Sequence, residues 1–150
     1  MIVDDKIMTY VLYKMRTVAE TRRKCHMLKY EDDYIDEVID YLVEAGYLND
    51  DNYTKKYIEN VLRLKNDSAN GIKIDLMQKG VSEDIIEKYL YSDEVKEFEE
   101  NSCMILAEKK YKSTLDILKV KKFLINKGFT YDAVAKAIDN LDVVDDNNYE

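Results

Sequence analysis

Three segments of this sequence carry the same pattern of residues, and that repetition limits the possible folds more than any other feature. The three copies are Arg22–Leu42, Lys73–Leu90 and Lys121–Leu141. They align when Lys29, Gly80 and Gly128 are placed in register, with offsets of 51 and 48 residues between copies. A basic residue lies seven positions before each aligned residue, and an apolar one lies four positions before it. A tandem array of similar units is therefore predicted.

Each copy is predicted to form two helices joined by a tight turn. Apolar pairs follow the aligned residue at five and six positions and again at nine and ten positions in all three copies. Because these pairs are four residues apart, they lie on one face of a helix. Gly80 and Gly128 suit the position just after a helix, where the backbone adopts a positive φ. Lys29 takes that position in the first copy. A Cβ there costs on the order of 1 kcal/mol, so we expect a looser or differently wound turn.

A further helical stretch precedes each pair, so the chain is predicted to consist of three three-helix repeats. The three stretches are Lys6–Arg16, Asp51–Leu64 and Asp93–Tyr111. Thr17 followed by Glu20 forms a capping box at the start of the next helix. A sheet-rich fold would need frequent turn residues, whereas this chain contains no Pro and four Gly. We expect an all-α protein whose stacked repeats share their cores in an elongated, curved, solenoid-like array.

The predicted boundaries fall between the three-helix units. Repeat 1 covers 1–48, repeat 2 covers 49–91 and repeat 3 covers 92–141. Asn49 suits the start of a helix, because a capping side chain there is followed by acidic residues that favour the helix dipole. Residues 142–150 are polar and acidic, and we expect them to form a disordered tail.

The composition excludes several classes of protein. A total of 23 basic against 31 acidic residues gives a formal net charge of −8, which on average disfavours a protein devoted to coating nucleic acid. One His and two Cys cannot form a four-ligand Cys/His zinc site without a carboxylate ligand. No apolar run approaches the roughly 18–20 residues of a membrane span, and the N-terminus lacks the features of a signal peptide. We therefore expect a cytoplasmic protein without a metal, a cofactor or a membrane contact.

The sequence contains no constellation typical of an enzyme. Neither a GxxxxGK[ST] phosphate loop nor a GxGxxG motif is present. Cys25 shares its alignment column with Leu76 and Leu124, which indicates a small core residue rather than a catalytic thiol. Acidic pairs such as Asp32-Asp33 stand at predicted helix starts, where the helix dipole explains them better than paired catalysis does. We expect a protein that acts by binding.

Three stretches of the chain carry a resemblance to a known family. In Gly46–Tyr53 a helix ends at Gly, and an aromatic, an aliphatic and an acidic pair then lead into the next helix. Gly71–Val81 forms the companion segment, and Lys127–Phe129 with the apolar pairs after it forms a third signature. In this order and spacing they resemble the RecX family, bacterial regulators of the RecA recombinase. The resemblance covers roughly Lys6–Leu141.

The resemblance implies a small cytoplasmic protein of three tandem three-helix repeats that acts in DNA repair, DNA recombination and the SOS response. RecX proteins bind the RecA filament along its helical groove and oppose its growth. They thereby lower ATP hydrolysis, strand exchange and RecA-assisted cleavage of the SOS repressor, and some also contact DNA. For this chain we expect a monomeric, non-enzymatic regulator that modulates the RecA filament, chiefly by inhibiting it. The single-stranded DNA inside the filament is expected as a second contact.

Basic residues at equivalent repeat positions are the first candidate binding surface. They are Arg22, Lys73 and Lys121, reinforced by Arg23 and Lys122. Because equivalent positions line up in a stack of repeats, these charges could form one stripe facing an acidic groove or a phosphate backbone. Ordinary solvated helix charges are the alternative interpretation.

A second basic stretch lies in the third repeat. Lys109 and Lys110 begin a segment, 109–127, whose seven lysines are accompanied by only two acidic residues, Glu108 just before it and Asp116 within it. Two other functions therefore stay open: a helical-repeat module that binds single-stranded nucleic acid through this segment, and a generic protein-interaction adaptor.

Tyrosine supplies the last set of candidates. The chain has 13 Tyr and no Trp, and Tyr joins a large apolar area to a polar tip, as interface residues often do. Five tyrosines fit the apolar stripes less well and are therefore predicted on the surface: Tyr13, Tyr41, Tyr47, Tyr91 and Tyr131. Of these, Tyr47 and Tyr131 are the candidate partner-binding residues.

Overall fold

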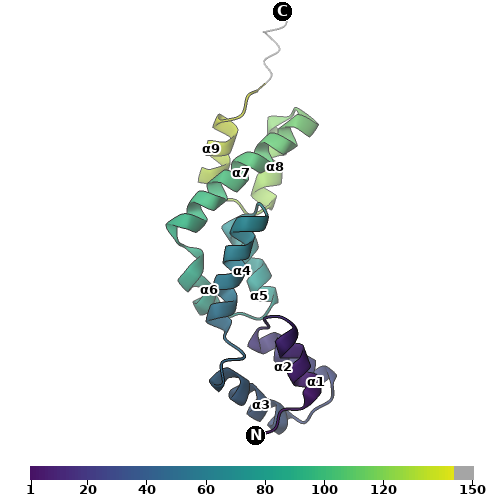
Figure 1. Ribbon diagram of the computed structural model, residues 1–150. Coiled ribbons are helices and arrows are strands. Elements are labelled where there is room, and N and C mark those ends of the chain that lie inside the picture. Colours follow the sequence, from purple (N-terminus) through teal and green to yellow (C-terminus); the bar gives the residue numbers. More distant parts are fainter. Residues whose placement is uncertain (144–150) are drawn as a thin grey trace, which may run out of the picture. The chain divides into compact units, whose positions relative to one another are not determined.

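The computed structural model describes residues 1–143, and all regular secondary structure in that part of the chain is helical. The helices are α1 (Asp5–Tyr13), α2 (Val18–Met27), α3 (Asp32–Glu44), α4 (Asp50–Leu64), α5 (Ala69–Gln78), α6 (Glu83–Leu90), α7 (Asp93–Thr114), α8 (Ile117–Asn126) and α9 (Tyr131–Asp139). The prediction of an all-α protein is therefore confirmed (Figure 1). Of the tail predicted to be disordered, residues 144–150 lie outside the described part.

The first predicted helix ends earlier than expected. The apolar periodicity predicted helix up to Arg16, but α1 ends at Tyr13 and Lys14 is extended, with φ −158°. Arg16 turns back, so that its Nε donates to the Tyr10 carbonyl at 3.1 Å and its guanidinium lies 3.9 Å from the Tyr10 ring centre. These contacts stabilise a helix end at Tyr13, which is about one turn before the end that periodicity alone predicts.

The turns of the helix pairs α2–α3, α5–α6 and α8–α9 share one geometry. Lys29, Gly80 and Gly128 have φ values of 65°, 85° and 94°. Each of these amides donates to the carbonyl three residues earlier, and the following amide donates to the carbonyl five residues before itself. In the first turn these two bonds are Lys29 N to His26 O at 3.0 Å and Tyr30 N to Cys25 O at 3.2 Å.

The expectation of a looser turn at Lys29 is therefore wrong. The left-handed backbone of a residue with a Cβ costs on the order of 1 kcal/mol. The turn satisfies two carbonyls at the end of α2 that would otherwise lack partners, and each such bond contributes about 1 kcal/mol. Lys29 is also exposed, so its side chain meets no packing constraint.

The described chain divides into two compact units that cut across the predicted second repeat. The first unit contains Met1–Glu59 and Ile74–Tyr89, and the second contains Asn60–Lys73 and the residues from Leu90 onward. Helices α4 and α5 contribute residues to both units. The repeat boundaries given above remain predictions.

Each unit has its own apolar core. In the first unit the core helices are α1, α2 and α3, and Cys25 is fully buried there, as its alignment column predicted. In the second unit α8 and α9 pack against α7 (Figure 1). The buried side chains of that core include Val120, Leu124 and Val134, each of which contributes about 1.5–3 kcal/mol by leaving water.

Candidate functional site

Two hydroxyl side chains at equivalent positions connect one predicted repeat to the next. Thr17 caps α2 by accepting a hydrogen bond from Glu20 N (3.0 Å), and its Oγ1 donates to the Lys79 carbonyl at 2.6 Å. Ser68 caps α5 by accepting from Gly71 N (2.9 Å), and its Oγ donates to the Lys127 carbonyl at 2.7 Å. A hydroxyl can do both because it has one proton and two lone pairs. We call each set of contacts a repeat joint, and each lies inside one compact unit.

Glycine is required at the two turns that receive these contacts. A Cβ on Gly80 would overlap the Cβ of Ala19, next to the helix start that Thr17 caps. A Cβ on Gly128 would lie 2.9 Å from Asn70 Nδ2 and 3.0 Å from Ser68 Oγ. The absence of a side chain therefore serves two purposes at these positions: a positive φ and the close approach of the preceding repeat.

A carboxylate completes each repeat joint. Asp50 Oδ1 accepts from Val18 N at 2.9 Å in the first unit. Glu99, only 8% exposed, accepts from the backbone amides of Ala69 and Thr130 in the second unit. Burial raises the pKa of both carboxyl groups, although the amide hydrogen bonds work in the opposite direction.

The repeat joints are structural features that sequence reasoning missed. The available signal is that Thr17 and Ser68 both lie twelve residues before the aligned turn residue. The third member of this column is Asp116, whose side chain caps α8 by accepting from Leu118 N at 3.0 Å. A carboxylate has no proton to donate, so Asp116 cannot make the outgoing bond that Thr17 and Ser68 make.

The predicted basic column is distributed over both units. Arg22 is half-buried in the first unit and pairs with Asp36 at 2.7 Å, which links α2 to α3. Lys73 is half-buried and Lys121 is exposed, both in the second unit. The alignment of these three charges along one ridge therefore remains a prediction.

The other basic candidates lie on the surfaces of both units. Arg23 is exposed and lines a polar cavity that Glu20 and Asp75 also line, so both signs of charge meet there. In the second unit Lys109 and Lys110 line a shallow hollow with Phe123, and the Lys110 Nζ lies 4.8 Å from the centre of that ring. Lys122 is exposed on α8.

The five tyrosines predicted at the surface are all exposed, from 38% for Tyr41 to 79% for Tyr13. Tyr131 begins α9 and lines a cavity of about 420 Å³ together with Lys121, so the structure brings these two candidates together. Tyr47 follows Gly46, and its amide donates to the Leu42 carbonyl at 2.9 Å. Exposure agrees with a partner surface, but the binding roles of these residues remain predictions.

Two negative findings concern residues 1–143. None of the helices in this part is both long and apolar enough to span a bilayer. The same residues contain no group of three or more His, Cys, Asp or Glu side chains arranged to hold a metal ion.

The sequence is similar to several regulatory proteins. No protein-family model matches it. Regulatory protein RecX of Finegoldia magna is 33% identical over 144 residues, which are 91% of this chain and 70% of that protein. Regulatory protein RecX of Clostridium botulinum is 36% identical over 132 residues, or 83% of this chain and 61% of that protein. The chain thus spans about three-fifths of the length of the first relatives it matches.

Solved structures are also similar to this one, and two of them are crystal structures of RecX proteins. The crystal structure of RecX from Lactobacillus salivarius has a TM-score of 0.80 at 30% identity, covering 93% of this chain and 94% of that chain. A crystal structure described as regulatory protein RecX has a TM-score of 0.82 at 20% identity, covering 90% and 70%. At that lower identity the second structure supports the fold alone.

Proposed function

Because this chain belongs to the RecX family of regulatory proteins, we propose that it binds filaments of the RecA recombinase and inhibits their extension without catalysing a reaction. The observation that carries the proposal is the similarity to RecX from Lactobacillus salivarius over 94% of that chain. A regulator of this kind needs a partner surface rather than a catalytic centre. The consequences at the filament would be lower ATP hydrolysis, less strand exchange and less cleavage of the SOS repressor. RecA acts in the cytoplasm, where this chain would therefore work.

The exposed basic residues of the second unit support a contact with an acidic groove or a phosphate backbone. Lys121 and Lys122 lie on α8, and Lys109 lies on α7. Because α8 packs against α7, these lysines belong to one packed pair of helices. Such charges raise the rate at which the protein encounters a polyanion, and this effect weakens as salt is added because salt screens the charges.

A filament offers the same site on every protomer, which favours a regulator built from repeats. Each predicted repeat would make one weak contact, and once the first contact forms the others become intramolecular. A chain bound across several protomers would fix their spacing and oppose the addition of new ones. Inhibition should then require far fewer regulators than RecA protomers.

The test is a titration of single-stranded-DNA-dependent RecA ATP hydrolysis with this protein. We expect half-inhibition well below one regulator per RecA protomer. A requirement for molar excess over RecA would contradict filament blocking, and unchanged hydrolysis at every ratio would contradict inhibition itself. A matched control is the same titration on pre-assembled filaments, for which slower onset is expected because extension is already complete.

A single-stranded nucleic-acid-binding module is the second candidate function, and one observation favours it. Phe123 carries two cations over its ring, Lys110 at 4.8 Å and Lys127 at 5.5 Å, within the basic segment 109–127. Aromatic rings beside lysines are typical of surfaces that stack bases and neutralise phosphates. A gel shift with single-stranded DNA in the absence of RecA, weakening steeply with salt, would support this function.

A further inference from the structure

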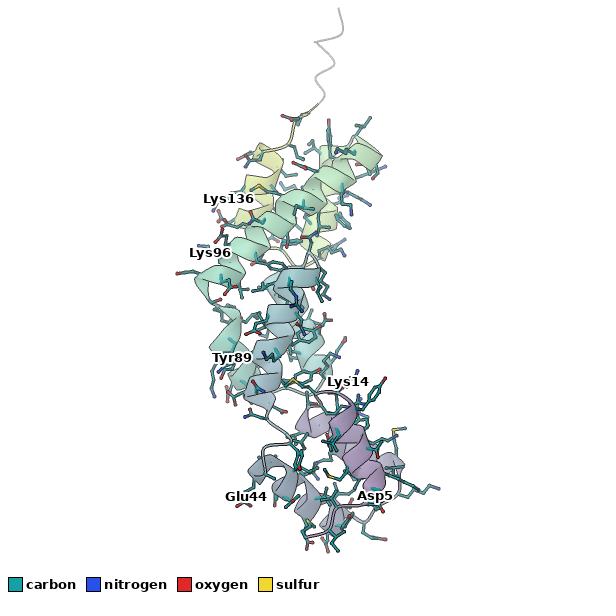
Figure 2. The ribbon with its side chains drawn as sticks, in the orientation of Figure 1. Asp5, Lys14, Glu44, Tyr89, Lys96 and Lys136 are labelled. Carbon is teal, nitrogen blue, oxygen red and sulfur yellow. The ribbon has the colours of Figure 1, made fainter. Side chains whose placement is uncertain are left out.

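A cavity of about 410 Å³ in the second unit has no role in the function proposed above. It lies where the start of α5, the first part of α7 and the start of α9 meet. Its volume falls within the roughly 300–1,000 Å³ typical of ligand sites. Figure 2 labels Lys96 on α7, at the rim of this cavity, and Lys136 on α9.

The floor of the cavity is apolar. Leu90, Val95 and Ala133 line it and are at most 4% exposed to solvent. Gly128 and Ala69 add backbone and small side-chain surface. A floor of this kind suits the methylene stem of a long side chain, which gains free energy by leaving water.

The rim and the depth of the cavity carry more negative than positive groups. The acidic lining residues are Asp93, Glu99, Glu100 and Asp132, and the basic ones are Lys73 and Lys96. Lys136 lies beside the cavity, where its Nζ donates to Glu100 Oε1 at 3.1 Å and lies 3.4 Å from Asp132 Oδ2. With every group charged, four carboxylates against three ammonium groups leave one net negative charge around the cavity, which favours a cation over an anion.

An anion is a poor occupant for a separate reason. Among the groups that could hold one are the backbone amides of Ala69 and Thr130, at the starts of α5 and α9. Both amides already donate to the Glu99 carboxylate. An incoming anion would have to displace that carboxylate and would also meet its charge.

The exposed ring of Tyr91 distinguishes between the possible cations. Tyr91 lines the cavity and is 66% exposed, so its ring is available to a ligand. A guanidinium group is planar, stacks on aromatic rings and donates in a fork that matches carboxylates, whereas an ammonium group is more strongly hydrated.

We propose that this cavity binds an arginine side chain of a partner protein, with its stem on the apolar floor and its guanidinium between Tyr91 and the carboxylates. The proposal does not depend on which partner supplies the arginine. It is therefore independent of the proposed action on RecA.

The test uses a peptide and a neutral isostere of it. The ¹⁵N–¹H spectrum of the full chain is titrated with acetyl-Ala-Arg-Ala-amide and, separately, with the same peptide containing citrulline, which replaces the guanidinium by an uncharged urea. We expect amide shifts within 90–96 and 130–133 and a Kd on the order of 1–10 mM for the arginine peptide. The citrulline peptide should bind about tenfold more weakly, since a charge-assisted hydrogen bond is lost.

Three variants complete the design. Glu99→Gln should weaken binding of the arginine peptide about tenfold. Asp132→Asn, at an exposed position, tests the charge without risk to the core, and Tyr91→Ala should weaken binding about threefold. Tyr13→Ala, at a tyrosine of the first unit that is 79% exposed, is the matched control and should bind as the parent chain does.

Three results would overturn the proposal: equal binding of the arginine and citrulline peptides, no shifts at 20 mM peptide (about twice the upper expected Kd), or shifts confined to other residues. The proposal would also be overturned if Asp132→Asn and Tyr91→Ala both bound the arginine peptide as tightly as the parent chain does.

Discussion

The Thr17 hydroxyl donates a 2.6 Å hydrogen bond to the Lys79 carbonyl, 62 residues further along the chain. The carbonyl belongs to the residue just before Gly80, in the turn between α5 and α6. Ser68 makes the same bond to Lys127, 59 residues away. A helix cap in one predicted repeat is thus bonded to the helix end of the next, and the first predictions concern this arrangement.

Removing the hydroxyl should cost more at a repeat joint than at an ordinary cap. Thr17→Val keeps the shape but loses both the cap and the bond to Lys79 O, so the free energy of unfolding should fall by about 2 kcal/mol. Thr130→Val is the control: its exposed hydroxyl caps α9 by accepting from Ala133 N at 3.1 Å, and its contact with Glu99 is made by the backbone amide, which valine keeps. About 1 kcal/mol is expected for this variant. Urea unfolding of both variants measures the difference, and equal losses would contradict a separate contribution from the joint.

The loss of stability on replacing a turn glycine by alanine should depend on which atoms pack against that glycine. Gly80→Ala combines a positive φ with an overlap at Ala19, so a loss of about 2–4 kcal/mol is expected. Gly46→Ala has a similar φ of 86° with no atom within 4 Å of the new Cβ, so backbone strain of about 1 kcal/mol should be its whole cost. Thermal and urea unfolding should rank the variants in that order. A larger loss for Gly46→Ala would refute the packing argument.

Lys29→Gly should stabilise the protein, in contrast to the glycine-to-alanine substitutions. The lysine already adopts φ 65° in an exposed turn, and glycine removes that strain while adding entropy to the unfolded chain. We expect stability to rise by up to about 1 kcal/mol. A measured loss above about 0.5 kcal/mol would show that the lysine side chain contributes contacts of its own.

The joint carboxylates should make stability depend on pH in a defined direction. Burial raises the pKa of Asp50, so its folded state holds the proton more tightly than the unfolded state does. Its contribution to stability is therefore greatest below the ordinary Asp pKa and is lost as pH rises through the raised value. Relative to the parent, Asp50→Asn should gain stability between about pH 4 and pH 7.

Asp51 supplies the matched comparison on the same helix. The hydroxyl of Tyr89, labelled in Figure 2, donates to Asp51 Oδ1 at 2.7 Å, and Lys88 Nζ lies 3.3 Å from it. These groups lower the pKa of Asp51, so its contribution is present above the ordinary pKa and is lost as pH falls. Asp51→Asn should therefore lose stability relative to the parent as pH rises from about 3 to 7. If the stability of both variants relative to the parent changed with pH in the same direction, the opposite pKa shifts of Asp50 and Asp51 would be contradicted.

Charge reversal on α8 tests the proposed partner surface. Lys121→Glu combined with Lys122→Glu should raise the concentration for half-inhibition of RecA about tenfold, because two exposed cations become anions. The helical circular dichroism should not change. Lys14→Glu, at an exposed lysine of the first unit labelled in Figure 2, is the control and should inhibit as the parent does. Unchanged inhibition by the double variant would remove Lys121 and Lys122 from the surface.

The turns and helix faces could be predicted from the sequence because they depend on local periodicity. Gly80 and Gly128 marked the helix ends, and the column of Cys25, Leu76 and Leu124 proved fully buried. The early end of α1 could not be predicted in this way, because it depends on where the Arg16 side chain lies. The joints required contacts between residues about 60 positions apart, which periodicity does not encode. The cavity beside Glu99 escaped prediction for the same reason.

The most direct measurement is the growth of single RecA filaments on tethered single-stranded DNA, followed with fluorescent RecA. We predict that one chain of this protein per about ten RecA protomers stops extension within seconds, as a multivalent block should. Extension at an unchanged rate with equimolar protein would contradict the account.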